Sequence, residues 1–129
     1  MHRHLRKRAT AVIVRGGKVL LVKHRGQRHF SLPGGGMKLG ESVLAAIARE
    51  LYKELKLEAQ NIKRLEHCDF DSVATRHYVC MVETEGEPIP RRLEVAKFIW
   101  WDMKEHIPIF PHVGKTLNRV LGKPLPLEV

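Results

Sequence analysis

The sequence has little cysteine and no long apolar run. Cys68 and Cys80 are its only cysteines, and no CxxC pair or histidine at zinc-ligand spacing accompanies them. This excludes a zinc finger and favours two reduced, half-buried residues on neighbouring strands, with a redox pair as the alternative. No segment approaches the roughly 20 apolar residues of a membrane helix, and the charged N-terminus lacks a signal peptide's apolar segment. We therefore expect a cytoplasmic protein without a membrane partner.

Several familiar catalytic and binding motifs are also missing. The sequence contains no Walker A loop, no Rossmann fingerprint and no Ser-His-Asp pattern. None of the eight histidines stands in HxxxH or similar ligand spacing. Histidine-based zinc chemistry and triad hydrolysis are therefore not indicated.

The charge is strongly one-sided, with 23 basic and 14 acidic side chains and a net charge of +9. Such an excess attracts polyanionic partners such as nucleotides, sugar phosphates or nucleic acid. Four basic residues lie in the leading segment: Arg3, Arg6, Lys7 and Arg8. We interpret residues 1–8 as a basic arm with frayed structure, and residues 9–129 as one domain.

Two periodicities dominate the first half of the chain. Ala9–Val14 and Val19–Val22 are β-branched runs around Gly16-Gly17, a pattern typical of a β-hairpin. After three consecutive glycines, an amphipathic helix is predicted to start at Glu41, with Glu41 or Ser42 as its cap. Its apolar stripe has helical spacing and consists of Leu44, Ile47, Ala48, Leu51 and Leu55.

The second half adds strands and a terminal helix. Strands are predicted over Lys63–Phe70, His77–Glu83 and Lys97–Trp101. A short helical turn after Asp102 and a helix from Val113 to Leu121, closed by Gly122 and Pro124, follow. Strands combined with one long central helix and one terminal helix indicate an α/β or α+β sandwich.

Two acids on the long helix suggest a metal site. Glu50 and Glu54 are four residues apart, so their carboxylates lie one helical turn from each other. A glycine-rich loop precedes the helix, and its backbone can approach a ligand closely. Mg²⁺ prefers carboxylate, carbonyl, water and phosphate oxygens. A divalent ion held here would neutralise phosphate charge and activate water.

The segment Gly35–Leu57 resembles the signature of the Nudix pyrophosphohydrolases, G-x5-E-x7-R-E-U-x-E-E-x-G-U, where U is a bulky aliphatic residue. Seven positions match at the required spacing, namely Gly35, Glu41, Arg49, Glu50, Leu51, Glu54 and Leu57. Lys53 replaces the first glutamate of the Glu-Glu pair, and Lys56 replaces the glycine. An ammonium group has no lone pair for a metal ion. We call residues 35–57 the Nudix box.

The resemblance implies roles for individual residues. Glu54 becomes the principal carboxylate ligand of Mg²⁺ or Mn²⁺, and Gly34 contributes a backbone carbonyl. Glu50 is a second ligand or the base that activates water. Glu94 is a candidate for a further acid from outside the box.

The remaining candidates hold the loop or contact the substrate. Arg49 belongs with the catalytic set because it positions the acids, and Gly35 and Glu41 are structural. Substrate-binding candidates are Arg28, His29, Lys53 and Arg76.

The implied fold is an α/β/α sandwich with a mixed central sheet, one long box helix and a C-terminal helix. The implied function is metal-dependent cleavage of a diphosphate linkage in a nucleoside diphosphate joined to another group. Lys53 and the basic surplus support an alternative, a Nudix domain that binds nucleotide or RNA without hydrolysis. The partner is then a nucleotide, a nucleoside-diphosphate-linked molecule or an RNA 5′ end, and proteins with this resemblance are commonly homodimers.

Overall fold

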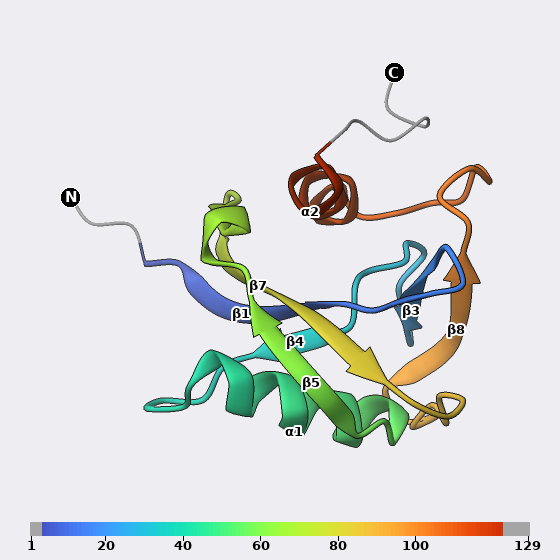
Figure 1. The fold of residues 1–129 in the computed structure, drawn as a ribbon, viewed down its shortest axis with the longest axis horizontal. Helices are drawn as coiled ribbons and strands as arrows, with labels where there is room; N and C mark the ends of the chain where they lie inside the picture. Colours follow the sequence, from blue (N-terminus) through green and yellow to red (C-terminus); the bar gives the residue numbers. More distant parts are fainter. Residues whose placement is uncertain (1–3, 123–129) are drawn as a thin grey trace.

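The computed structural model describes residues 4–122 and consists of strands between two helices. Helix α1 (Val43–Leu55) and helix α2 (Pro111–Leu121) lie on opposite sides of the β-strands (Figure 1). The strands are β1 (Arg6–Val12), β2 (Val14–Arg15), β3 (Lys18–His24), β4 (Gly34–Gly36), β5 (Ala59–Arg64), β6 (Phe70–Asp71), β7 (Thr75–Thr84) and β8 (Val95–Trp101). The expected layered α+β architecture is confirmed.

The larger sheet is mixed, as expected. Its strand order is β4-β1-β7-β5, with β6 paired to β7. Strands β1 and β7 run parallel, with Arg8 beside His77, whereas β4, β5 and β6 pair antiparallel. Arg6 to Arg8 therefore belong to β1 and not to a frayed arm, while residues 1–3 lie outside the described part.

The predicted first hairpin was wrong in its pairing. The Gly16-Gly17 turn joins β2 to β3, with Val14 opposite Val19, but β1 pairs with β4 and β7. The chain leaves the larger sheet at Ile13 and enters a smaller sheet of order β2-β3-β8. The run Ala9–Val14 therefore contributes to both sheets. Its β-branched residues favour a strand, but they do not determine which strand pairs with it.

Helix α1 starts and ends as its sequence allows. The Ser42 side chain accepts a hydrogen bond from the Ala45 amide at 3.1 Å and caps the N-terminus. Lys56 closes the C-terminus in the left-handed conformation, with φ of 52°, and its amide donates to the Tyr52 carbonyl. Lysine therefore adopts here the conformation that glycine usually supplies at this position.

The buried face of α1 differs from the predicted stripe. Leu44 and Ala48 are exposed, and the buried residues are Ala46, Ile47, Glu50, Leu51, Glu54 and Leu55. The helix is thus rotated so that both acids face inward rather than lie beside an apolar stripe. A face that includes two carboxylates is not selected by hydrophobic periodicity, since burying a charge is costly without partners.

Two further segments differ from the predictions. The strand expected over Lys63–Phe70 is interrupted by a 3-10 helix, η1 (Glu66–Cys68), between β5 and β6. No helical turn follows Asp102, whose carboxylate instead accepts the Lys104 and Glu105 amides in a local turn. Helix α2 ends at Gly122 as predicted, whereas Pro124 lies outside the described residues.

The core forms on both sides of the larger sheet. Ala9 and Ala11 of β1 pack towards α1, whereas Val12 packs with Val113 and Leu117 of α2. Alternate residues of β1 therefore face opposite helices, as strand geometry requires. The cysteines are free and fully buried rather than half-buried, one in each core layer, and Cys68 lies in η1 rather than on a strand. Within residues 4–122, no helix has the length and apolarity to cross a membrane.

Candidate active site

The glycine run forms β4 and brings backbone close to the acids. Gly34 lies opposite Thr10 of β1 and has a φ of 133°, which only glycine adopts readily. A Cβ on Gly34 would lie 2.0 Å from the Ala9 carbonyl oxygen, and one on Gly35 would lie 2.6 Å from the Glu50 carboxylate. Both glycines are therefore required by close approaches, one to β1 and the other to the acid on α1.

Arg49 connects this loop to the helix. Its guanidinium donates to both carboxylate oxygens of Glu41 at 2.7 and 2.9 Å, to the Gly36 carbonyl at 3.0 Å and to Glu50 at 2.6 Å. The Arg49 guanidinium, with the Lys38 amide, holds the pKa of Glu41 down at about 2. A bidentate arginine with two further acceptors fixes loop and helix together, as expected for a structural pair.

Glu54 lies deep in the site with one oxygen uncompensated. Its Oε2 is 2.8 Å from Nε2 of His24 at the end of β3, and its Oε1 is buried with no hydrogen-bond partner among residues 4–122. Both Glu50 and Glu54 are about 95% buried, with exposures of 5% and 4%. A buried carboxylate oxygen without a partner is costly unless a cation or donor from a ligand completes it.

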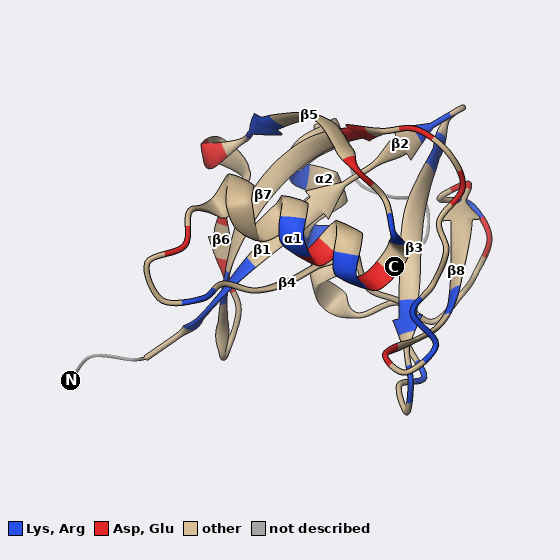
Figure 2. Cartoon of the chain, turned by 90° about the horizontal axis from the view of Figure 1, so that it is seen from below, with Lys and Arg blue, Asp and Glu red and all other residues tan. Residues whose placement is uncertain are grey.

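Lys53 occupies the space between two acids. Its Nζ lies 3.6 Å from Glu50 and 3.7 Å from Glu94, which also contacts Arg91 at 3.7 Å. Figure 2 shows the alternation of basic and acidic residues along α1. The structure therefore brings Glu94 to the edge of the site through Lys53.

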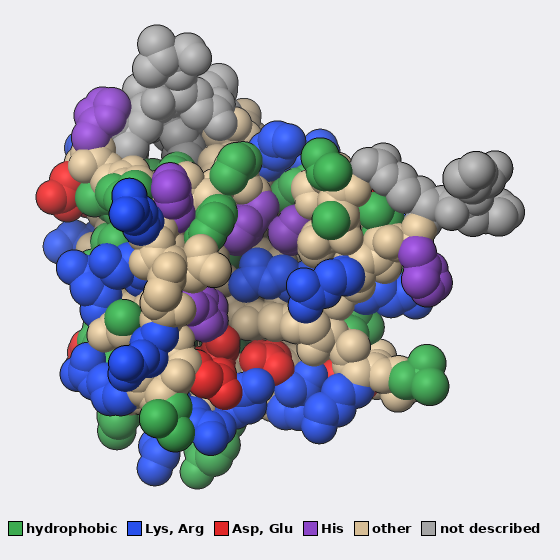
Figure 3. Space-filling view, turned by 180° about the vertical axis from the view of Figure 1, so that it is seen from behind, with side chains coloured by type: hydrophobic (Ala, Val, Ile, Leu, Met, Phe, Trp, Pro, Cys, Tyr) green, Lys and Arg blue, Asp and Glu red, His purple; other side chains and the backbone are tan. Residues whose placement is uncertain are grey.

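A cleft of about 850 Å³ opens beside these acids, between the larger sheet and α2 (Figure 3). Its walls come from β1, the end of β3 and the segment that follows it to Ser31, the glycine run, α1, the turn before β7 with the start of β7, and the start of α2. The lining residues used below are Arg6, Lys7, Arg8, Gly34, Glu54, His77, Phe110, His112 and Lys115. A cleft of this size accommodates a nucleotide-sized ligand.

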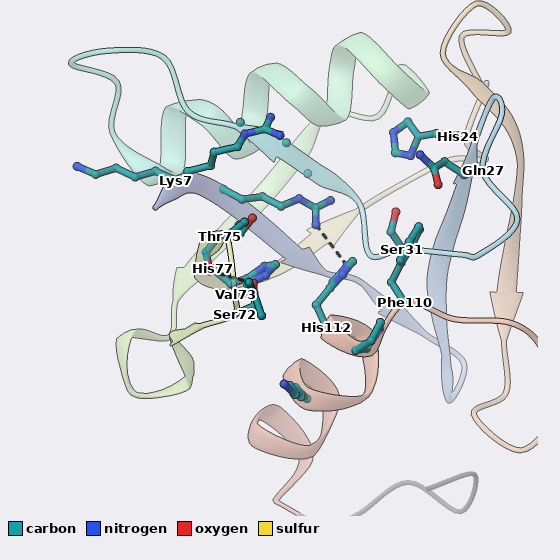
Figure 4. Close-up of a pocket in the computed structure, with 18 of the residues that line it drawn as sticks. Lys7, His24, Gln27, Ser31, Ser72, Val73, Thr75, His77, Phe110 and His112 are labelled. Atoms are coloured by element: carbon teal, nitrogen blue, oxygen red, sulfur yellow. Dashed lines mark hydrogen bonds between the residues drawn. The ribbon is translucent and has the colours of Figure 1, made fainter. Parts of the chain in front are cut away.

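Arg8 and two histidines form the floor of the cleft. Arg8 donates to the Leu32 carbonyl at 2.8 Å, and its Nη1 lies 3.3 Å from Nε2 of His112, the contact drawn as a dashed line in Figure 4. Burial, with the neighbouring Arg8 charge, lowers the pKa of His77 to about 4 and that of His112 to about 3. Both imidazoles are therefore neutral near pH 7.

The histidine rings belong to a stack that crosses the cleft floor. His77 stacks between Phe70 and His112, at centroid distances of 4.7 and 5.2 Å, and His112 continues to Phe110 at 6.0 Å. The stacked neutral rings offer apolar surface beside the charged Arg8.

Comparison with known proteins identifies this arrangement. A family model described as "NUDIX domain" matches residues 5–119 of the chain. This range contains every segment that lines the cleft. The chain belongs to the NUDIX domain family.

Individual relatives match the chain over a short segment or at low sequence identity. An RNA pyrophosphohydrolase of Actinobacillus pleuropneumoniae serotype 5b (strain L20) is 37% identical over 51 residues, which are 40% of this chain and 25% of that protein. The matched region thus spans a quarter of the relative's length. A MutT NUDIX hydrolase from Burkholderia pseudomallei has a TM-score of 0.76 at 23% identity, over 92% of this chain and 99% of that one. A UDP-X diphosphatase has a TM-score of 0.77 at 18% identity, over 95% and 66% respectively. At these identities the likeness to the two structures shows a shared fold.

The fold places some of the predicted residues in the cleft and leaves others outside it. Gly34, Gly35 and Glu54 line it, and Arg49 and Glu50 lie directly behind them. Of the substrate-binding candidates, Arg28 and Arg76 do not line the cleft, and Arg76 pairs with Asp71. His29 is exposed, and its ring lies 5.2 Å from Phe110 at the rim.

Sequence reasoning missed two residues of the cleft floor, Arg8 and His112. Arg8 was assigned to a frayed arm, and His112 received no role. The sequence did contain a signal for Arg8. Every second residue of a strand lies on the same face, so Arg8 shares one face of β1 with Thr10 and Val12. For His112 no local signal exists, since α2 reaches the cleft only through the tertiary fold.

The neutral histidines make the Nudix fold acid-sensitive. Because the pKa of His77 is lowered, to about 4 from its ordinary 6.5, the unfolded chain binds this proton more tightly than the folded one. The contribution of the neutral His77 to the free energy of unfolding is fully present above pH 6.5 and is lost as the pH falls towards 4. We expect His77→Gln to reduce the loss of unfolding free energy between pH 6.5 and 4.5, measured by urea unfolding. The exposed His67→Gln serves as control, and an unchanged pH profile in both variants would contradict the assignment.

Proposed function

We propose that this Nudix protein is a metal-dependent pyrophosphohydrolase, which cleaves a diphosphate linkage in a nucleoside diphosphate joined to another group. The observation that carries the proposal is the buried Glu54 carboxylate, whose Oε1 has no partner among residues 4–122 and which lines a basic cleft. An uncompensated acid in a cleft that a glycine backbone also lines is an arrangement that a divalent cation stabilises.

The residues present fit a divalent cation such as Mg²⁺ or Mn²⁺. The side chains of Glu54 and Glu50 and the carbonyl of Gly34 would hold it. Within residues 4–122, no three His, Cys, Asp or Glu side chains form a ligand cluster, so carbonyl, phosphate or water oxygens have to complete the coordination. When bound, such a cation neutralises phosphate charge and lowers the pKa of water.

The protein itself supplies orientation and charge around this centre. Arg49 donates to Glu50 at 2.6 Å and fixes the position of this carboxylate, so it can accept a proton from the attacking water. His24 fixes the other acid by its 2.8 Å contact with Glu54. The cations of the cleft attract the phosphates of the substrate, and preorganised charge of this kind contributes much of the rate in phosphoryl transfer.

The substrate class is proposed from the size and charge of the cleft. A nucleotide moiety fits about 850 Å³ lined by stacked rings and cations. Nucleoside-diphosphate-linked small molecules and RNA 5′ ends both satisfy this requirement. The names of a UDP-X diphosphatase and an RNA pyrophosphohydrolase among the related proteins are consistent with either class.

Lys53 supports a second candidate, a domain that binds phosphorylated ligands without hydrolysis. Its ammonium group lies 3.6 Å from Glu50 and 3.7 Å from Glu94, so it neutralises acids that would otherwise attract a cation. A fixed positive charge at this point can take the place of a metal ion in holding a phosphate.

Lys53→Glu distinguishes the two candidates. The substitution removes the cation next to Glu50 and adds an oxygen ligand, so the metal concentration for half-maximal turnover is expected to fall by about tenfold. The assay measures release of the phosphorylated products from ADP-ribose, UDP-glucose and a 5′-triphosphorylated oligonucleotide, with Mg²⁺, Mn²⁺ or EDTA.

Two controls separate the effect of charge from the effect of a new ligand. Lys53→Gln removes the cation without adding a carboxylate, and Lys63→Glu reverses the charge of an exposed lysine on β5. Metal-dependent turnover by the parent protein supports the hydrolase. Turnover that appears first in Lys53→Glu supports the binding domain and contradicts the hydrolase.

A further inference from the structure

Arg8 differs from the other half-buried arginines in its partners. Arg15, Arg49 and Arg64 each have a carboxylate within 4 Å, at distances of 3.7, 2.6 and 2.8 Å. Within residues 4–122, no carboxylate lies within 4 Å of Arg8, whose side chain contacts the Leu32 carbonyl and His112. A half-buried guanidinium held only by neutral acceptors is incompletely compensated.

The environment of Arg8 disfavours its charge. Burial lowers the pKa of this guanidinium, which is opposed by the more distant Glu54 and Glu50. The imidazole partner His112 is neutral near pH 7, as shown above. A guanidinium has five donors, and the two contacts leave donors free on a side chain that lines the cleft. An anion in the cleft would satisfy these donors and offset the charge.

Other cations surround the same end of the cleft. Lys7 and Arg6 come from β1, and Lys115 comes from the first turns of α2. In the described part of the chain, none of these three has a carboxylate within 4 Å. Figure 3 shows basic side chains and histidines above the acids of the box, so the cleft has a basic and an acidic end.

We propose that Arg8 is the centre of a phosphate-binding subsite, which holds a phosphoryl group of the ligand through the guanidinium and without a metal ion. Arg8 binds this group by charge-assisted hydrogen bonds, and Lys115 of α2, which also lines the cleft, contributes a second positive charge. The inference rests on the proposed function only in taking the ligand to be a phosphorylated compound.

The subsite narrows the substrate class. Carboxylates repel phosphate unless a cation intervenes, so a phosphoryl group at Arg8 is held apart from the one at Glu54. The preferred ligand therefore carries a phosphoryl group in addition to the linkage at the acids. This group is either the third phosphate of a nucleoside triphosphate or a phosphodiester of an oligonucleotide.

The test measures binding in EDTA, where the acids hold no metal ion. The probe is inorganic pyrophosphate, titrated by isothermal calorimetry. Arg8→Gln is expected to weaken binding by about tenfold or more, because charge-assisted hydrogen bonds are lost. Arg8→Lys retains the charge and is expected to stay within a few-fold of the parent. Lys63→Gln removes one positive charge outside the cleft and is the matched control.

Lys115→Gln keeps the test decisive if Arg8→Gln fails to fold after losing its bond to Leu32. Lys115 is exposed, so its replacement leaves the core intact. Weaker binding in Lys115→Gln than in Lys63→Gln supports the subsite. Equal binding in these two variants, or parent-like binding in folded Arg8→Gln, overturns it.

A second pair of probes identifies the source of the phosphoryl group. ATP is compared with ADP, and a 5′-phosphorylated adenine dinucleotide is compared with AMP, each in parent and Arg8→Gln, or in Lys115→Gln where Arg8→Gln fails to fold. In each pair, the affinity gained from the additional phosphoryl group is measured. The pair in which this gain is smaller in the variant identifies the source of the group. If neither pair shows a gain in affinity, the result counts against a subsite for an additional group. Failure of the subsite leaves metal-dependent turnover and its loss in Glu54→Gln unaffected, so the two proposals fail separately.

Discussion

Glu54→Gln is expected to lower metal-dependent turnover by about a hundredfold or more, the scale on which loss of an essential charged group acts. The amide has nearly the shape of the carboxylate and can keep a contact with His24, which lies 2.8 Å away. It lacks the negative charge with which Glu54 would hold a cation. The measurement is steady-state hydrolysis of the best substrate of the panel, at several Mg²⁺ and Mn²⁺ concentrations.

Stability provides the second readout of this substitution. The Glu54 side chain is buried and one oxygen has no partner within residues 4–122, so the charge is a cost to the fold in the absence of a cation. The thermal midpoint of Glu54→Gln in EDTA is therefore expected to equal or exceed that of the parent, as for residues kept for function at the expense of stability. Glu58→Gln, at an exposed position, is the control. Unchanged turnover in folded Glu54→Gln would show that the site does not hold a catalytic metal.

The box and its helix were accessible from the sequence because their signals are local. The Ser42 cap and the spacing of Arg49, Glu50 and Glu54 all lie within a short segment. The orientation of the helix could not be predicted from the sequence. Hydrophobic periodicity favours Leu44 on the buried face, but the fold exposes Leu44 and buries Glu54 in the cleft that the glycine run also lines. The two buried carboxylates oppose the hydrophobic pattern, so a rule based on the burial of apolar residues fails here.

The cleft floor depends on contacts between distant segments. His77 of β7 lies beside Arg8 of β1 in a parallel pair, and α2 brings His112 to the same point. Parallel neighbours are separated by long crossovers, so the sequence near Arg8 does not indicate which strand will lie next to it. The same reason explains why β1 was paired with the wrong strand. Local pattern predicts that a strand forms, whereas its partner is decided by the packing of the whole chain.

Gly34→Ala is expected to destabilise the fold by about 3 kcal/mol or more, which corresponds to a decrease of about 10 °C in the thermal midpoint. Gly34 has a φ of 133°, and a Cβ there would lie 2.0 Å from the Ala9 carbonyl oxygen. Alanine therefore strains its own backbone and also pushes β4 away from β1. Because the same residue offers its carbonyl to the proposed cation, metal affinity should fall together with stability. Urea unfolding and the metal dependence of turnover measure the two effects.

Gly36→Ala is the matched control from the same strand. A Cβ on Gly36 meets nothing within 4 Å, and its φ lies outside the region that disfavours alanine, so stability should stay within about 0.5 kcal/mol of the parent. If Gly34→Ala were as stable as Gly36→Ala, the close pairing of β4 with β1 would be wrong. The carbonyl of Gly34 would then have no fixed position in the cleft that Glu54 lines. A large loss confined to Gly34→Ala would instead show that the loop is held rigidly against β1, which is the condition for a backbone carbonyl to serve as a metal ligand.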